Sequence, residues 1–244
     1  KERTHMSFDP YEFDRSYGFS AQGLSEGEYT ARTFLWMVLG LMVTFGVAVL
    51  CWLTNATIYA LILIPAVQVI VLIATLILSF VMVRRIERMS VAAARTMFLI
   101  FSALFGFTMS IYLLIYDLTS LVFAFLATAL YFGVLAAYGR LTGRDLSGIR
   151  PILFSGLLFL VIFGVISLFI PALSLFDSIS CLIGIAVFLG YTAYDTQRIR
   201  AFYHYYAGYP DMLEKASIFA ALQLYLDFVN LFLYLLRFLG RRRD

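Results

Sequence analysis

The sequence contains little charge. Only 14% of its 244 residues are Asp, Glu, Lys or Arg, whereas a soluble domain typically has about 25%. Hydrophobic residues make up 62% of the chain, and the mean hydropathy is +0.90. This composition excludes an ordinary soluble globular protein and indicates a polytopic membrane protein. The net charge of +3 does not indicate nucleic-acid binding, because the basic residues lie at the ends of apolar segments.

Cysteine and cofactor motifs are equally scarce. Cys51 and Cys181 each lie inside an apolar segment, so we interpret both as small buried hydrophobic residues rather than as a disulfide or a reactive pair. The sequence contains no G-x-x-x-x-G-K-[ST], C-x-x-C or H-E-x-x-H motif. We therefore expect no resident cofactor, and we expect no nucleic acid among the partners.

Long hydrophobic runs dominate what remains. A membrane-spanning helix needs about 20 mostly apolar residues, and seven segments meet this requirement. They cover residues 31–53, 58–83, 92–116, 120–138, 151–170, 174–199 and 216–240. Capping patterns precede the first and sixth, at Ser25 with Glu28 and at Ser174 with Asp177, and Pro151 suits the start of the fifth. The predicted fold is an all-α seven-helix transmembrane bundle over 31–240, with an N-terminal arm at 1–30 and a basic tail at 241–244.

The connections between the segments predict how the chain sits in the membrane. Arginine and lysine are concentrated in the second, fourth and sixth connections, and the alternate connections contain neither. By the positive-inside rule the N-terminus and the basic connections are cytoplasmic. With seven spans the basic tail lies on the other side. A re-entrant seventh segment would avoid this, but the segment is long enough to cross.

The seventh segment carries an aspartate near its middle. Asp227 follows the start of the segment by about 15 Å of helix, close to the centre of a bilayer about 30 Å thick. Gln223, Asp227, Asn230 and Tyr234 share one helical face, so this polar stripe must face protein or a wet cavity. Acidic residues inside the membrane are usually functional.

The sixth segment carries a second acid. Asp195 shares a helical face with Gly184, Phe188 and Tyr191 and lies near the cytoplasmic end. Two carboxylates in a low-dielectric site would share a proton and titrate as a coupled pair, which could sense pH, bind a cation or perform acid–base chemistry. Alternatively, Asp195 pairs with Arg198 at a wetted helix end. With straight helices the two acids would lie at unequal depths, and a tilt or local unwinding would bring them together.

Several motifs resemble those of the Bax-inhibitor (transmembrane Bax inhibitor motif) family, in its bacterial type. They are Y-x-x-Y-D ending at Asp195, L-Y-L-D-F-V-N-L-F over 224–232, L-L-R-F-L-G over 235–240 and R-D-L-S over 144–147. The resemblance implies a seven-helix bundle with the last helix central, located in the bacterial cytoplasmic membrane. It also implies a calcium leak that pH regulates through two aspartates, which match Asp195 and Asp227.

The resemblance further implies an arginine latch from the second segment. In the family an arginine at the cytoplasmic end of that helix contacts the aspartate of the sixth, and Arg84 matches it best, with Arg85 next. Family members often carry a glutamate within this helix. Here the helix offers only Gln68, Thr75 and Ser79, which leaves no equivalent of the glutamate as a cation ligand.

Three functions are compatible with these sequence features. The leading hypothesis is a non-enzymatic, pH-regulated cation leak in which Asp195 and Asp227 bind Ca²⁺ and protons, because Ca²⁺ prefers carboxylate oxygens. The second is an interaction protein that modulates a membrane protease or a stress or cell-death pathway through a membrane-protein partner. The third is an intramembrane aspartyl protease. Tyr194–Asp195 resembles the Y-D motif of such proteases, but the residues that end at Asp227 do not form their G-x-G-D motif.

Overall fold

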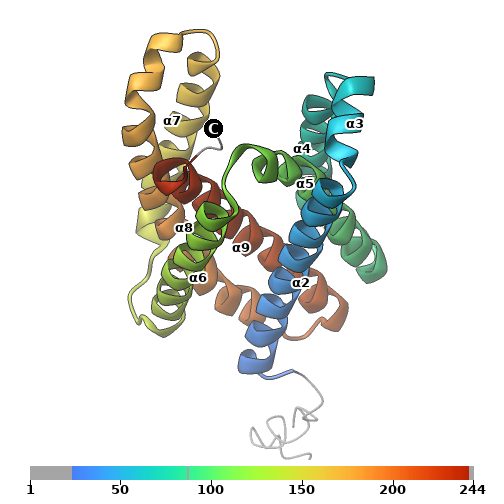
Figure 1. Cartoon of the computed structure of the whole chain (residues 1–244). Helices are drawn as coiled ribbons and strands as arrows, with labels where there is room; N and C mark the ends of the chain where they lie inside the picture. Colours follow the sequence, from blue (N-terminus) through green and yellow to red (C-terminus); the bar gives the residue numbers. More distant parts are fainter. Residues whose placement is uncertain (1–23, 87, 242–244) are drawn as a thin grey trace, which may run out of the picture.

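The computed structural model describes residues 24–86 and 88–241, and these residues form a bundle of helices (Figure 1). The long helices follow the chain as α2 (Glu26–Leu53), α4 (Val67–Arg85), α5 (Val91–Ile115), α6 (Leu118–Leu141), α7 (Arg150–Ser167), α8 (Asp177–Tyr206) and α9 (Pro210–Leu239). Short helices complete the order: α3 (Ala56–Leu63), η1 (Ser147–Ile149) and η2 (Pro171–Phe176). Seven of the described helical segments are long and apolar enough to cross a membrane. The predicted all-α polytopic fold is therefore confirmed.

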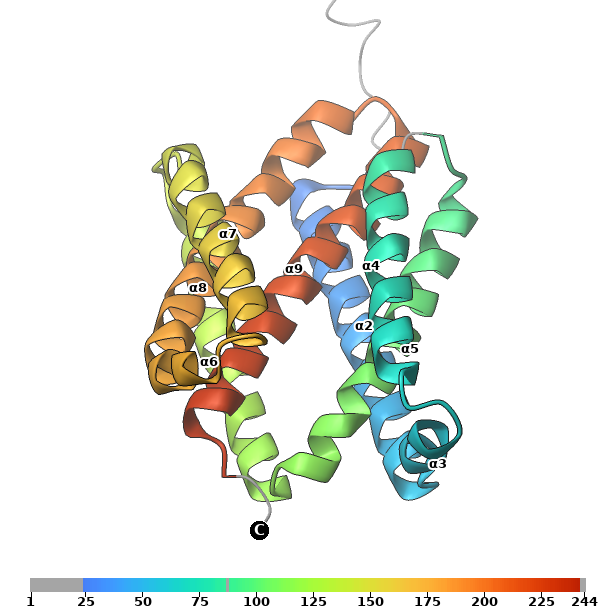
Figure 2. The same ribbon diagram turned by 90° about the horizontal axis from the view of Figure 1, so that it is seen from above.

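Helix α9 occupies the centre of the bundle, as predicted. It contacts α2, α5, α6 and α8 (Figures 1 and 2). In its most apolar stretch 67% of residues are buried, compared with 11% for α4 and for the fifth span. Aromatic packing explains part of this burial, because Tyr225 lies edge-on against Phe98, Phe101 and Phe105 of α5, with ring centroids 5.5 to 6.1 Å apart.

The predicted helix bounds are wrong at three places. The segment 58–83 is not one helix, because Pro65 separates α3 from α4 and holds Ile64 in an extended conformation. The sixth and seventh helices are longer than expected: α8 runs to Tyr206, and α9 begins at Pro210. The residues from 200 to Tyr206, which lie beyond the predicted sixth segment, are therefore helical.

The helix starts test the capping predictions. The capping box of Ser25 with Glu28 is confirmed at the start of α2, with Glu28 N–H donating to Ser25 Oγ at 3.2 Å. Helix α7 begins at Arg150 with Pro151 in its first turn, also as predicted. Ser174 is not an N-cap, because η2 continues to Phe176, which occupies the cap position of α8 without a side-chain capping bond.

The predicted terminal segments lie largely outside the described residues. The N-terminal arm was expected to cover 1–30, and only its last residues are described, where α2 begins at Glu26. Of the basic tail, Arg241 alone is described, and its N–H donates to Ser120 Oγ at 3.0 Å.

Arginines gather at the end of the bundle where α2 begins. We call this the basic end; its arginines contact or lie in electrostatic range of Glu26, Glu214 or Asp195, and they are Arg32, Arg95, Arg140, Arg150, Arg198 and Arg200. Helix α9 starts at the basic end and finishes at the opposite one, where the C-terminus lies (Figure 2). The structure thus shows the charge asymmetry on which the predicted membrane orientation depends.

Candidate functional site

The two intramembrane acids meet between α8 and α9. Asp195 is 7% exposed and Asp227 is 4% exposed, and their carboxyl groups lie within interaction range of each other. Two neighbouring buried carboxyl groups cannot both ionise at low cost, so a proton held between them would stabilise the pair.

The packing of α8 on α9 brings these acids to one level. The helices run antiparallel, with Phe202 beside Phe219 at one point and Phe188 stacked on Tyr234 further along. The ring centroids are 6.0 and 5.9 Å apart. Because the first turns of α9 extend past the end of α8, Asp227 aligns with Asp195 despite lying further from the connection. Neither helix is unwound at its aspartate.

One oxygen of the pair has no protein partner. Oδ2 of Asp227 is buried and makes no hydrogen bond to any residue that the structure describes. Phe228, the next residue, packs edge-on against Phe125 and Phe132 of α6. A buried acceptor left unpaired in apolar surroundings is rare and marks a place where water or an ion can be bound.

Arg198 supplies the positive charge at this pair. Its Nη1 lies 3.4 Å from Oδ1 of Asp195, and its guanidinium lies over the ring of Phe202, 4.9 Å from the centroid. Arg84, predicted as the latch, is instead exposed and stacks over Phe80 at 4.7 Å. Its helix, α4, packs chiefly on α5. The arrangement in this structure is thus the alternative pairing of Asp195 with Arg198, and the latch from α4 is not formed.

The other residues of the predicted polar stripe differ in what they contact. Tyr234 faces α8, where its ring fills the space beside Gly184. Asn230 donates from its amide to the carbonyl of Leu226 at 2.8 Å, a bond within α9 itself. Gln223 is half-buried. Within this stripe, Tyr234 packs directly against the face of α8 that carries Asp195.

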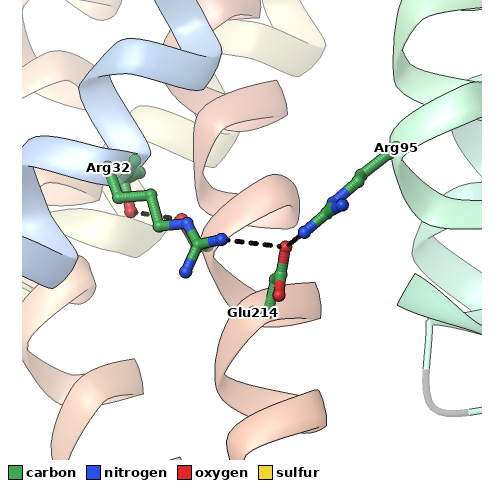
Figure 3. A network of polar contacts seen from close by, with 5 residues as sticks. Arg32, Arg95 and Glu214 are labelled. Carbon is green, nitrogen blue, oxygen red and sulfur yellow. Dashed lines mark hydrogen bonds and ion pairs between the residues drawn. The ribbon is translucent and has the colours of Figure 1, made fainter. Parts of the chain in front are cut away.

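A second ionic site at the basic end was missed by the sequence analysis. Glu214 of α9 forms ion pairs with Arg32 of α2, at 3.2 Å, and with Arg95 of α5 (Figure 3). The adjacent Lys215 is 6% exposed and donates to the carbonyl of Met89 at 3.3 Å. These contacts fix the start of α9 to three other parts of the chain. The only sequence signal was an acidic and a basic residue at the start of an apolar run.

At the basic end, Glu26 also links α2 to α8. Glu26 accepts a hydrogen bond from Arg200 at 2.9 Å, and its second oxygen lies 3.3 Å from Nε2 of His204. A small polar pocket lies beside these residues, between α2, α6 and α8. It is lined by Glu26, Thr30, Gly139, Arg140, Thr142, Thr196, Gln197 and Arg200.

The polar residues of the second predicted segment do not come together in one site. Thr75 and Ser79 donate to carbonyls within α4. Both amide atoms of Gln68 are buried and have no partner among the described residues. The described residues also contain no cluster of three or more His, Cys, Asp or Glu side chains able to hold a metal. The acid pair therefore offers at most two carboxylates to a cation.

These features define a class of protein: a multi-pass membrane protein whose central helix presents a buried carboxylate to a second one on its neighbour. Residues 27–244 match the family described as "Inhibitor of apoptosis-promoting Bax1", and the chain belongs to this family. The match covers every helix from the second residue of α2 onward.

The following three relatives come from bacteria, and two of them are named as membrane proteins. An uncharacterized protein of Rickettsia prowazekii (strain Madrid E) is 38% identical over 88% of this chain and 90% of its own length. Inner membrane protein YbhL of Escherichia coli (strain K12) is 36% identical over 88% of this chain and 92% of its own. An uncharacterized membrane protein of Streptococcus pyogenes serotype M6 is 38% identical over 63% and 66%.

Proposed function

We propose that this protein conducts a cation across the membrane and that pH regulates the flux through the paired carboxyl groups of Asp195 and Asp227. The observation that carries the proposal is the meeting of two buried acids inside a bundle of membrane-spanning helices. Burying them is costly, and such groups in membrane proteins usually belong to ion or proton pathways. Ca²⁺ is the cargo that we propose, because it binds carboxylate oxygens.

The chemistry follows from competition for the same oxygens. In this structure Arg198 contacts Asp195, and the neighbouring buried acids would share a proton because both cannot ionise at low cost. A Ca²⁺ ion entering the site would have to displace the proton and the guanidinium, with the unpaired Oδ2 of Asp227 among its ligands. The remaining ligands would be backbone carbonyls and water, since Ca²⁺ takes six to eight oxygens. A shift of the proton would change the strength of the Arg198–Asp195 ion pair and thus how readily Ca²⁺ reaches the acids.

A role for Arg84 as a second latch would require movement. Arg198 already occupies the position beside Asp195, so Arg84 could contact this acid only after α4 had approached α8. Arg84→Gln distinguishes the two arginines: if Arg198 alone holds the site, this variant leaves the pH dependence of flux unchanged, whereas Arg198→Gln alters it.

Flux into liposomes of the purified protein tests the proposal. Uptake of Ca²⁺ is followed with a trapped dye over a series of pH values, for the wild type, Asp195→Asn and Asp227→Asn. We expect both variants to lose the pH dependence, because the shared proton is gone. Asp211→Asn, an exposed acid in the first turn of α9, is the matched control and should behave as the wild type. Unchanged pH dependence in both aspartate variants would refute the assignment of the sensor.

We also propose that the basic end faces the cytoplasm. The arginines at that end are what the positive-inside rule places there. Cysteine labelling of intact cells tests this orientation: a cysteine replacing Ser147, in the connection between α6 and α7, should resist an impermeant reagent until the membrane is opened. Labelling of that cysteine in intact cells would reverse the orientation.

An intramembrane protease would use the same two acids, and the backbone argues against it. Asp227 lies inside an uninterrupted helix between Leu226 and Phe228, with no glycine beside it to open the backbone to a peptide. We therefore propose a non-enzymatic role. Incubation with model transmembrane peptides, with and without an aspartyl-protease inhibitor, checks this, and inhibitor-sensitive cleavage would contradict it.

The family description favours a second role that is compatible with the first. It refers to inhibition of an apoptosis-promoting protein, so we propose that the chain also binds a membrane-protein partner in a stress or cell-death pathway. Cross-linking in membranes, followed by capture with and without residues 1–29, tests whether the N-terminal segment provides the contact.

A further inference from the structure

Helix α7 is attached to the bundle chiefly through α8. It packs on α8 and on the two short helices at its ends, η1 and η2 (Figures 1 and 2). Only 11% of the most apolar stretch of this span is buried. Its position relative to the acid pair therefore depends on the contacts that it makes with α8.

These contacts keep the two antiparallel helices in a constant register. A Cβ added at Gly156 would lie 2.6 Å from a methyl group of Val187, and one added at Gly190 would lie 2.5 Å from a methyl group of Leu153. Moving three residues back along α7 thus corresponds to moving three forward along α8. Three residues further back along α7 is Arg150, the first residue of that helix, which by the same register lies beside the turn of α8 that precedes Asp195.

The same register places Gln197 beside the connection that precedes α7. Its amide nitrogen donates to the carbonyl of Arg144 at 2.7 Å, and its amide oxygen accepts from the N–H of Leu146 at 2.9 Å. One side chain thus satisfies two backbone groups of the loop between α6 and α7. From Leu146 the chain passes directly through η1, whose Ile149 N–H donates to the Leu146 carbonyl at 3.1 Å. The anchored loop is therefore connected to Arg150 by a single helical turn.

Arg150 brings a second positive charge to the acid pair. Its guanidinium lies within electrostatic range of the carboxyl group of Asp195 and of the hydroxyl of Tyr191. Arg198 is the other cation at this carboxyl group, and Asp227 is the acid that faces it from α9. Asp195 thus receives positive charge from its own helix and from α7.

The charged groups from the remaining neighbours of α8 are engaged elsewhere. Glu26 of α2 binds Arg200 and His204, and Arg140 of α6 lies in range of the same glutamate. Among the described residues the cation that reaches Asp195 from outside α8 is therefore Arg150, and its position depends on the anchored loop.

We propose that Gln197 is a positioning residue for the acid pair: its amide holds the loop between α6 and α7 on α8 and thereby keeps the guanidinium of Arg150 within electrostatic range of Asp195. The effect on cation flux rests on the proposed function, whereas the placement of the charge does not. Displacing the loop would remove one positive charge from the pair without changing any group in the pair itself.

Infrared titration of the purified protein in lipid nanodiscs measures the charge directly, without flux. The C=O band of a protonated carboxyl group is assigned to Asp195 by its loss in Asp195→Asn, and its midpoint pH is then followed in the variants. In Arg150→Gln the midpoint should rise by roughly half to one pH unit, because a nearby cation favours the ionised acid. Arg150→Lys, which keeps the charge, should remain close to the wild type.

The positioning role is tested by combining variants. Gln197→Leu should raise the midpoint in the wild-type background and have no further effect in Arg150→Gln, because the charge that it positions is already absent. Gln197→Asn, which keeps the amide but is one methylene shorter, should act in the same way and serves if the leucine variant does not fold. Arg144→Gln is the matched control, since it removes a loop charge but keeps the carbonyl, and should leave the midpoint unchanged.

Two results would overturn the inference. One is an unchanged midpoint in folded Gln197→Leu or Gln197→Asn. The other is an equal shift with and without Arg150, which would mean that Gln197 acts independently of that charge. If the liposome experiment shows no cation flux while the infrared shifts are found, the proposed function fails and the positioning role remains.

Discussion

Tyr225 of α9 donates a hydrogen bond to Thr44 of α2, with 2.7 Å between their oxygens, inside the apolar part of the bundle. The direction is fixed because the single hydroxyl proton of Thr44 is donated to the carbonyl of Ser102 on α5, at 2.9 Å. Both hydroxyl-bearing residues are fully buried. This chain of two bonds links the central helix to two others inside the buried core.

The first prediction follows from this asymmetry. Thr44→Val leaves the buried hydroxyl of Tyr225 without a partner and should lower the free energy of unfolding by about 1–3 kcal/mol. Tyr225→Phe leaves Thr44 bonded to Ser102 and should cost only about 0.5–1.5 kcal/mol. Unfolding by sodium dodecyl sulfate in mixed micelles measures both. Thr128→Val is the control, since this buried threonine bonds only within its own helix; the order would be contradicted if Thr44→Val were the milder change.

The second prediction concerns the ion pairs of Glu214. Glu214→Gln removes the carboxylate that serves Arg32 and Arg95. The two arginines are 38% and 42% exposed, so solvent screens the unpaired cations and the loss of stability should be only about 1 kcal/mol. Asp211→Asn, on the same helix, should change stability less. The loss should shrink at high salt, and a loss independent of salt would show that packing rather than charge is responsible.

A third prediction tests the contact between α8 and α9. A Cβ at Gly184 would lie 2.6 Å from the ring of Tyr234, so Gly184→Ala should displace that ring and lower the free energy of unfolding by about 1–3 kcal/mol. Tyr234→Leu in the same chain should recover part of the loss. In α6, a Cβ at Gly133 meets no atom within 4 Å, so Gly133→Ala should be neutral or stabilising by up to about 1 kcal/mol. Equal losses at both glycines would contradict this account.

The fourth prediction uses an acid in the connection between α6 and α7. Ser147 donates its hydroxyl and its N–H to Asp145, and these bonds hold the pKa of that carboxyl group below its usual value. A lowered pKa in the folded state means that the contribution to stability is present above the unfolded pKa, near 4, and is lost as the pH falls through the folded value. Ser147→Ala should therefore raise the pKa of Asp145.

Carbon-13 NMR of labelled aspartate in detergent micelles measures this titration. Thr142→Ala serves as the control, because its hydroxyl contacts Arg144 N–H and not the acid. An unchanged titration of Asp145 in Ser147→Ala would show that the hydroxyl bond from Ser147 does not lower the pKa of this acid.

The membrane spans could be predicted because their signal is local. Each long apolar run satisfies its own backbone as a helix, and a nonpolar medium permits few alternatives. The boundaries were less predictable where the signal depends on a single residue. Pro65 divides an apolar run whose hydropathy is otherwise continuous. At the end of α8, the aromatic residues before Tyr206 are helical although they lie beyond the apolar run.

The acid pair was predictable in part. A carboxylate in an apolar run is conspicuous at any single position, which identified Asp195 and Asp227 separately. The relation between them depended on the tilt and register of two helices. The arginine beside them also followed from packing, because α4 lies against α5, so Arg84 is remote and Arg198 is near.

Glu214 and Gln197 show what local patterns omit. Neither residue is unusual for its position, since each lies near a helix end where polar side chains are common. Their importance comes from residues distant in the chain: Arg32 and Arg95 for Glu214, and the loop before α7 for Gln197.

The amino-acid sequence is enough to show that this chain spans a membrane, that apolar runs form its helices, and that two acids lie where burial has a high free-energy cost. Which groups meet those acids follows from the packing of the helices. The physical reason is that hydrophobicity is a property of each segment, whereas the pairing of charges depends on the angles and registers at which the segments pack.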